Sequence, residues 1–258
     1  AQDLDEAATA YTIYREEHRK KREDTSITDE DQQRFRETRE LLPDLGQQIQ
    51  LFDKYSRWDY GKSRRETWPE VVSRAIGFLF KSTSGAGLAP KEWEELEQSI
   101  LRMEVMPSMR VLQMGGPALE RCQLGSYNCA YAPIDDLRSF AELLYISMQG
   151  TGIAFSVEEE FGSQLSRIRR QKKRQRRPLI VVPDSTEGWC DSFLNYLELL
   201  WDGEDPQVDT SLIRPAGSIL RVKGGRSSGP SPFVDLLRGA KRLVLAKQGR
   251  HLEPYDAH

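Results

Sequence analysis

The sequence contains few cysteines and no long apolar run. Its three cysteines, Cys122, Cys129 and Cys190, are an odd number and include no C-x-x-C pair, so neither a disulfide framework nor a zinc site is expected. No segment is apolar enough over about 20 residues to cross a bilayer, and no signal peptide is recognisable. We therefore expect a cytoplasmic protein without a membrane partner and without a bound metal.

A strong net charge is also lacking, but positive charge is concentrated in one segment. The chain has 40 acidic and 37 Lys and Arg residues, yet residues 167–177 (RIRRQKKRQRR) hold eight cations and no anion. Such a run is typical of a solvated loop, and also of a segment that binds phosphates. No aromatic residue interleaves with the cations to stack on bases, which favours the solvated loop over a nucleic-acid-binding module.

Neither a P-loop nor a full dinucleotide-binding fingerprint is present. Gly150-Thr151-Gly152 alone predicts only a turn. Residues 224–232 (GGRSSGPSP) combine glycines, serines and an arginine before a helix, which suits an anion site and equally a flexible surface loop. Cys129, read without further knowledge, is a small apolar residue of a buried strand. The residues alone leave these alternatives open.

The sequence does contain a helical first half. Apolar residues recur there at steps of three and four, the period of an amphipathic helix. The predicted helices are 3–23, 46–58, 68–82, 90–104 and 136–149.

From residue 124 onward, short strands alternate with helices. Segments 127–133 and 152–158 are strand candidates on either side of the helix 136–149, which is a β-α-β pattern. Two further strands, 179–183 and 217–222, each precede a helix through a turn rich in Gly, Ser or Asp. We therefore expect an α/β layer whose strand ends form a ligand site.

Seven segments, taken in order, resemble the B12-dependent ribonucleotide reductases. They are FDKYSRW, RRETWPEVVSRAIGFL, MPSMRVLQMGGP, YNCAYAPIDDL, GTGIAFSVE, DSTEGWCDSF and RPAGSILRVKGGRSSGPSPFVDLL. The resemblance implies an α/β fold in which residues 25–122 form a helical N-terminal region and residues 123–258 form the first half of a ten-stranded α/β barrel. Residues 1–24 resemble the tail of an ATP cone.

The resemblance also implies a role for individual residues. Cys129 matches one of the two thiols that deliver reducing equivalents to the ribose, and so should face a substrate pocket. Cys122 and Cys190 match no catalytic position. The implied substrate-binding residues are Ser108, Arg110, Asn128, Gly150, Thr151 and Gly152. The implied effector-binding residues, for a deoxynucleoside triphosphate, are Asp184, Ser185, Gly188, Gly224, Gly225, Arg226, Ser227 and Ser228.

One departure from the family's pattern shapes the expected function. The radical cysteine of the family lies in an N-P-C segment, and no such segment occurs here. We therefore expect the N-terminal portion of a reductase that works with a second polypeptide carrying the C-terminal half, where adenosylcobalamin is mainly bound. An external thiol reductant and a homodimer of the assembled unit are further expected partners. The alternative is a non-catalytic nucleotide-binding or regulatory module derived from a reductase.

Overall fold

The computed structural model describes residues 29–173, 177–222 and 224–258, so the ATP-cone prediction and the helix predicted over 3–23 lie outside the described residues. The chain divides into two compact units, one ending at Ser126 and one running from Tyr127 to His258. Each unit has its own hydrophobic core.

The first unit is built on helix α4 (Trp68–Ser82). Pro69 lies in its first turn, where a missing N–H costs nothing, and the Thr67 N–H donates to the Glu70 carboxylate at 2.9 Å. The other elements are α2 (Asp29–Leu41), α3 (Leu45–Gln50), a π-helical turn (Leu51–Tyr55), β1 (Trp58–Asp59), β2 (Arg64–Arg65), α5 (Pro90–Leu101), α6 (Met109–Met114) and α7 (Pro117–Arg121). One face of α4 is buried in the core, with Trp68, Val71, Val72, Ala75 and Ile76.

The helix predictions in this unit are confirmed in place and differ at their ends. The helix predicted over 68–82 has those bounds, and the helix predicted over 90–104 ends at Leu101. The helix predicted over 46–58 ends at Tyr55, because the Ser56 hydroxyl donates to the Glu66 carbonyl at 2.6 Å and the chain turns into β1.

The second unit contains two parallel β-α-β arrangements. In the first, β3 (Cys129–Pro133), α8 (Leu137–Met148) and β4 (Gly152–Ser156) confirm the predicted pattern. In the second, β5 (Leu179–Val181), α10 (Thr186–Trp201) and β6 (Gln207–Asp209) are joined in the same way. The remaining helices are α9 (Glu159–Gly162), α11 (Ser231–Ala246) and α12 (Pro254–Ala257). The described residues form three two-stranded sheets, and the ten-stranded barrel stays a prediction.

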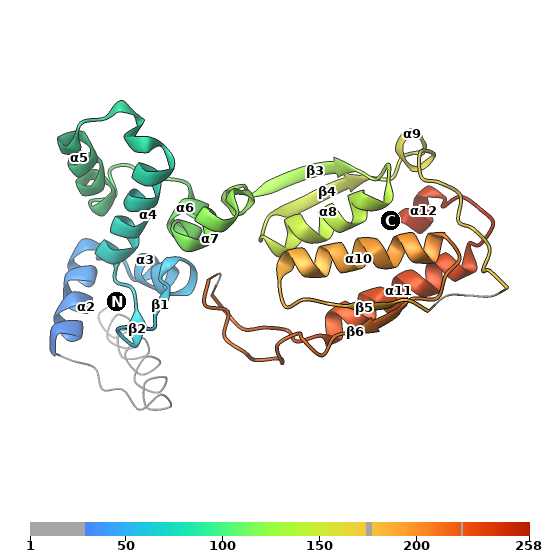
Figure 1. The fold of residues 1–258 in the computed structure, drawn as a ribbon. Helices are drawn as coiled ribbons and strands as arrows, with labels where there is room; N and C mark the ends of the chain where they lie inside the picture. The colour runs from blue at the N-terminus through green and yellow to red at the C-terminus, as the bar shows by residue number, and fades with distance from the viewer. Residues whose placement is uncertain (1–28, 174–176, 223) are drawn as a thin grey trace. The chain divides into compact units, whose positions relative to one another are not determined.

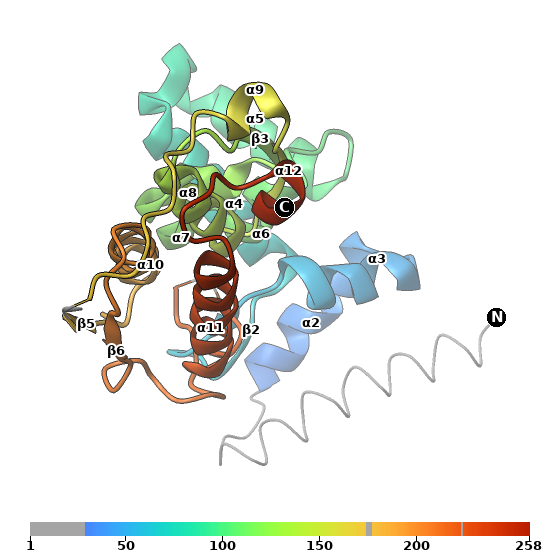
Figure 2. The same cartoon turned by 90° about the vertical axis from the view of Figure 1, so that its right-hand side faces the viewer.

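Helices α8, α10 and α11 supply most of the core of the second unit. Helix α8 covers one face of the β3–β4 pair and packs against α10, and both views show α10 and α11 side by side (Figures 1 and 2). Their facing residues are almost completely buried: Phe193, Leu197, Leu200, Leu237 and Val244.

The strand predicted over 217–222 is wrong. The described residues 217–222 and 224–229 form the two halves of a tight hairpin, with one β-bridge between Ile219 and Arg226. The Leu220 N–H donates to the Gly225 carbonyl at 3.0 Å, and the Gly217 N–H donates to the Ser227 carbonyl at 2.9 Å. The glycines at 217, 224, 225 and 229 all have φ between +71° and +85°, which an extended strand does not use. The apolar run therefore turns back on itself.

Residues 167–173 of the basic segment form a strap across the C-terminal ends of α10 and α11. The Arg169 N–H donates to the Trp201 carbonyl at the end of α10. The Ile168 N–H donates to the Arg250 carbonyl, and the Gly249 N–H donates to the Ile168 carbonyl, both just after α11. Ile168 is fully buried. Residues 167–173 thus form the predicted exposed loop, and its backbone is in addition anchored at Ile168 and Arg169.

We expect Gly203→Ala to destabilise the chain by about 3 kcal/mol or more. Gly203 has φ +79°, and a Cβ there would lie 2.5 Å from the Arg170 carbonyl oxygen of the strap. Gly217→Ala is the matched control, because Gly217 has φ +85° but open space around it, so only the backbone cost of about 1–2 kcal/mol applies. Urea unfolding measures both. Equal losses of unfolding free energy in the two variants would mean that the close approach of Gly203 to the Arg170 carbonyl does not contribute to stability.

Candidate functional site

Cys129 is the first residue of β3 and lies on the uncovered face of the β3–β4 pair. It is exposed and not in a disulfide. In the parallel register Cys129 is opposite Gly152, and Tyr131 is opposite Ala154; all four are exposed. Directly opposite residues share a face of the sheet, so the glycine leaves the space beside the thiol free of a side chain. The exposure of these four residues leaves this face of the strand pair open beside the thiol.

The loop before β4 is positioned by hydrogen bonds to the residues before β3. Gly150 has φ +90°, which ends α8 and turns the chain. The Gly152 N–H donates to the Asn128 carbonyl at 2.9 Å, and the Thr151 hydroxyl donates to the Tyr127 carbonyl at 3.0 Å. Thr151 is only 3% exposed, so its side chain fixes the loop, whereas Asn128, Gly150 and Gly152 are exposed.

Ser108 and Arg110, the other predicted substrate residues, lie in the first unit at the start of α6. Ser108 is the N-cap residue, and its hydroxyl oxygen accepts from the Arg110 N–H at 3.3 Å. Ser108 is exposed and Arg110 is half-buried. A capped helix start with a serine hydroxyl and a guanidinium can bind phosphate oxygens.

Two arginines outside the predicted site hold the other end of α6. The Arg57 Nε donates to the Gln113 carbonyl at 3.0 Å, and Arg74 donates to the Leu112 carbonyl at 3.0 Å and the Gly115 carbonyl at 2.8 Å. These carbonyls lie at the helix C-terminus, where cations are favourable. Burial, together with the nearby Arg74 charge, lowers the pKa of Arg57 to about 10.

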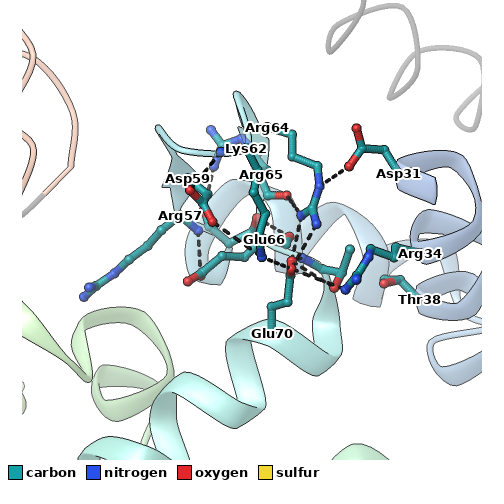
Figure 3. A network of polar contacts seen from close by, with 12 residues as sticks. Asp31, Arg34, Thr38, Arg57, Asp59, Lys62, Arg64, Arg65, Glu66 and Glu70 are labelled. Carbon is teal, nitrogen blue, oxygen red and sulfur yellow. Dashed lines mark hydrogen bonds and ion pairs between the residues drawn. The ribbon is translucent and has the colours of Figure 1, made fainter. Parts of the chain in front are cut away.

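These arginines belong to a network of charges that reaches across the first unit (Figure 3). Arg64 of β2 is 1% exposed and pairs with Asp31 of α2 and with Glu70 of α4. Glu66, two residues after Arg64, accepts a hydrogen bond from Arg74 at 2.8 Å. The network therefore connects α2, β2, α4 and α6. Sequence reasoning missed it, because RRET reads as an ordinary charged segment.

The network shifts the pKa values of its members. Burial alone would raise the pKa of Glu70, but hydrogen bonds from Arg64, Lys62 and the Thr67 N–H outweigh it and hold that pKa well below its ordinary value. The hydrogen bond to Glu70 raises the pKa of Arg64 against the effect of burial. Arg64 and Glu70 are both charged at neutral pH.

The predicted effector residues at the start of α10 lie in the second unit. Ser185 is the N-cap, and its hydroxyl oxygen accepts from the Gly188 N–H at 2.9 Å. Gly188 is buried, and a Cβ there would lie 2.6 Å from the Pro183 Cβ, so this glycine serves packing and its N–H is already satisfied. The role of Gly188 in effector binding stays a prediction. Asp184 and Ser185 are half-buried.

The second group of predicted effector residues forms the returning half of the hairpin. Gly224, Gly225, Arg226 and Ser228 are exposed, and Ser227 is half-buried. Arg226 donates to the Gly217 carbonyl at 2.9 Å, which ties the two halves together. The hairpin is closed at its base, where a Cβ at Gly229 would lie 2.8 Å from the Ala216 nitrogen.

The structure brings the two predicted effector segments to one end of the second unit. Arg214 Nε donates to Asp184 at 2.7 Å, which joins the α10 start to the chain that enters the hairpin. Trp189 of α10 packs on Phe233 of α11, with ring centroids 4.9 Å apart. The sequence analysis did not name Arg214 as a candidate site residue, although Arg214 is the first residue of the motif RPAGSILRVKGGRSSGPSPFVDLL. A cation and hydroxyls at one end of two helices can hold a polyphosphate.

The other two cysteines are placed differently from Cys129. Cys190 is buried in α10, and Cys122 is half-buried at the end of α7. Across the described residues, no three His, Cys, Asp or Glu side chains are grouped closely enough to hold a metal ion. The same residues include no helix long and apolar enough to span a bilayer.

A corrinoid does not fit the cavity beside the C-terminal half of α10. This cavity has a volume of about 380 Å³ and is lined by Arg167, Arg169, Glu198 and Asp202 among others. Its volume is at the lower end for small-molecule sites, and its paired charges do not suit a large corrin ring.

In sequence, the chain is similar to adenosylcobalamin-dependent ribonucleoside-triphosphate reductases. The chain is 26% identical over 226 residues to the adenosylcobalamin-dependent ribonucleoside-triphosphate reductase of Euglena gracilis, covering 80% of this chain and 30% of the relative. It is 22% identical to the protein of that name from Lactobacillus gasseri and 24% identical to that from Lactobacillus leichmannii, covering 79% of this chain and 36% of each relative. No family model matches. The predicted resemblance is confirmed, and the chain spans about a third of the length of these relatives.

A solved structure supports the same fold. A B12-dependent (class II) ribonucleotide reductase matches with a TM-score of 0.68 at 23% identity, covering 81% of this chain and 38% of that chain. The fold of the covered residues is therefore that of part of a class II reductase.

Proposed function

We propose that this chain supplies part of the catalytic unit of a ribonucleotide reductase, with Cys129 as one of its two redox thiols. The observation that carries the proposal is the exposed thiol at the start of β3, opposite a glycine, within the parallel β-α-β arrangement of a chain that resembles these enzymes. A thiol that reduces a substrate and is then reduced by exchange must be accessible. The exposed face supports this requirement.

This chain contributes one of the two sulfur atoms that the reduction requires. When the ribose 2′-hydroxyl leaves as water, the 2′ carbon takes up two electrons, and two thiols supply them by becoming a disulfide. Cys129 contributes one sulfur, and the second thiol and the radical cysteine come from a second polypeptide or segment. The substrate is a ribonucleoside triphosphate, as the names of the relatives suggest.

The first unit binds the substrate phosphates at the start of α6. Ser108 offers a hydroxyl and Arg110 a guanidinium, and the opposite end of the helix is held by Arg57 and Arg74. In the second unit Asn128, Gly150 and Gly152 are exposed, and the resemblance to the reductases implies that their backbone lies close to the nucleotide.

The second unit binds a deoxynucleoside triphosphate effector between the start of α10 and the hairpin 217–229. Asp184 and Ser185 lie on one side, Gly224, Gly225, Arg226, Ser227 and Ser228 on the other, and Arg214 connects them. The hairpin could pass the identity of the bound effector on to the substrate site, because its glycines give the backbone the freedom to adopt a second arrangement.

We expect Arg214→Ala to weaken deoxynucleoside triphosphate binding about tenfold to a hundredfold, the equivalent of losing one charge-assisted hydrogen bond. Arg238→Ala on α11 is the matched control, because Arg238 is exposed and pairs only with Asp235 at 3.2 Å. Isothermal titration measures both affinities. Hydrogen exchange should slow in residues 217–229 when the nucleotide is bound. Equal affinities for the two variants would remove Arg214 from the site.

A second candidate function is a nucleotide-binding regulatory module without catalysis. It is favoured by one observation: the hydrogen bond from Arg214 to Asp184 links the start of α10 to the chain before the hairpin without involving Cys129. Turnover separates the two functions. A module would bind nucleotide in every Cys129 variant and would support no reduction with any partner chain.

A further inference from the structure

The strap 167–173 divides its positive charges between two roles. Arg169 pairs with Asp202, the C-cap residue of α10, and Lys172 pairs with Asp202 and, at 2.7 Å, with Glu204. The hydrogen bond that Lys172 donates to the Asp202 carboxylate raises the pKa of Lys172, as expected of a matched pair. These two cations neutralise the acids at the end of α10 and account for part of the basic run.

The remaining cations of the strap do not neutralise acidic residues of the described chain. Arg167, Arg170 and Lys173 are exposed and make no ion pair with any residue between 29 and 258 that the structure describes. Arg167 donates only to the Gly249 carbonyl, and Arg170 passes beside Gly249. Arg250 is also exposed and equally without an acidic partner in the described ranges, and its carbonyl accepts from the Ile168 N–H. Four unpaired cations therefore lie on two adjacent segments.

These cations lie close together along one segment. Arg167, Arg170 and Lys173 fall within seven residues of an irregular segment, in which residues three apart are separated by at most about 10 Å. Like charges at this separation repel, so the fold gains no stability from them. The segment is held in place, because its backbone is bonded to both helix ends.

We propose that Arg167, Arg170, Lys173 and Arg250 form a surface that binds the phosphate backbone of double-stranded nucleic acid. The exposed residues of the strap include no aromatic side chain, so stacking on the bases of a single strand is not available. They include no apolar side chain either, and the one apolar residue, Ile168, is buried. An acidic peptide would find charge but no pocket for a side chain, whereas binding to duplex backbone takes its affinity from charge alone.

The cavity beside the strap is not the site. Arg167 and Arg169 line it, but so do the carboxylates of Glu198 and Asp202, which would repel a phosphate. Arg170, Lys173 and Arg250 do not line this cavity, so they are the main phosphate contacts, and Arg167 adds its charge beside them. This surface is separate from Cys129 and from both proposed nucleotide sites, and its test does not depend on reductase activity.

Fluorescence anisotropy with a labelled 20-base-pair duplex of mixed sequence tests the surface directly. We expect a Kd of about 10⁻⁴ to 10⁻⁶ M in 50 mM salt, and a log–log salt slope near −3 for about three or four phosphate contacts. The double variant Arg170→Glu/Lys173→Glu should bind at least tenfold more weakly, with a slope reduced by about 2. Arg138→Glu/Arg238→Glu carries the same change in net charge on exposed residues of α8 and α11, and should change Kd less than twofold.

Two further measurements complete the test. Thermal unfolding should show that the double variant is folded, and a single strand of the same length should bind no more tightly than the duplex. Three results would overturn the proposal: no binding to the duplex in 50 mM salt, equal weakening by the control pair, or displacement of the duplex by polyglutamate at an equal concentration of charge. The last would identify an acidic protein segment as the partner.

Discussion

Cys129→Ser is expected to abolish turnover in a complete reductase that contains this chain, while nucleotide binding is retained. Serine has nearly the same volume, and Cys129 is exposed, so the substitution has little effect on packing. A hydroxyl cannot form a disulfide, so the two electrons for the ribose 2′ carbon are missing. Rates of deoxynucleotide formation over several turnovers, together with nucleotide affinity, measure both expectations.

The two other cysteines provide the controls for this result. Cys122→Ser and Cys190→Ser should keep most of the activity, although the buried Cys190 should lose about 1–3 kcal/mol of stability when its thiol becomes a hydroxyl. If Cys129→Ser sustains repeated turnover, Cys129 is a strand residue without a redox role.

Arg64→Met is expected to destabilise the first unit by about 3–5 kcal/mol. Arg64 is 1% exposed and pairs with Asp31 and Glu70, so its loss leaves two shielded carboxylates without their main partner. Arg34→Met is the matched control: its side chain is 40% exposed, and its contact with the same Glu70 is 3.8 Å long, so it should cost less than about 1 kcal/mol. Urea unfolding compares them, and similar losses would mean that burial of Arg64 does not matter.

The same network gives an expected pH dependence. The pKa of Glu70 is lowered in the folded chain, so its contribution to stability is present above its unfolded pKa of about 4.3 and is lost as pH falls through the lower folded value. Stability of the wild-type chain should therefore decrease steeply below about pH 4. In Arg64→Met this decrease should be smaller, because the main hydrogen-bond donor to Glu70 is gone.

Local patterns predicted the elements that local interactions determine. Helix α4 has the predicted bounds, because its apolar period and its Thr67–Glu70 cap lie within one segment. The unit β3–α8–β4 was predicted for the same reason. Strand β6 was missed, since Gln207–Asp209 has three residues and no apolar run, and only pairing with β5 defines it.

Features that depend on distant residues could not be predicted. Nothing near Arg64 in the sequence indicates that Asp31 lies against it, 33 residues away. The sequence also does not show which cations of the basic run are paired. The structure does, because Asp202 and Glu204 lie beside Arg169 and Lys172. The motifs named Cys129, Asp184 and the 224–228 loop as site residues, but the link through Arg214 depends on the folded chain.

The redox role of Cys129 can be tested most directly by trapping thiols after a single turnover without external reductant. A complete enzyme is mixed with substrate and effector, quenched with an alkylating agent, and digested for mass spectrometry. The account predicts that Cys129 is found in a disulfide with a cysteine outside this chain, while Cys122 and Cys190 are alkylated as free thiols. Free, alkylated Cys129 alongside one equivalent of deoxynucleotide product would contradict it.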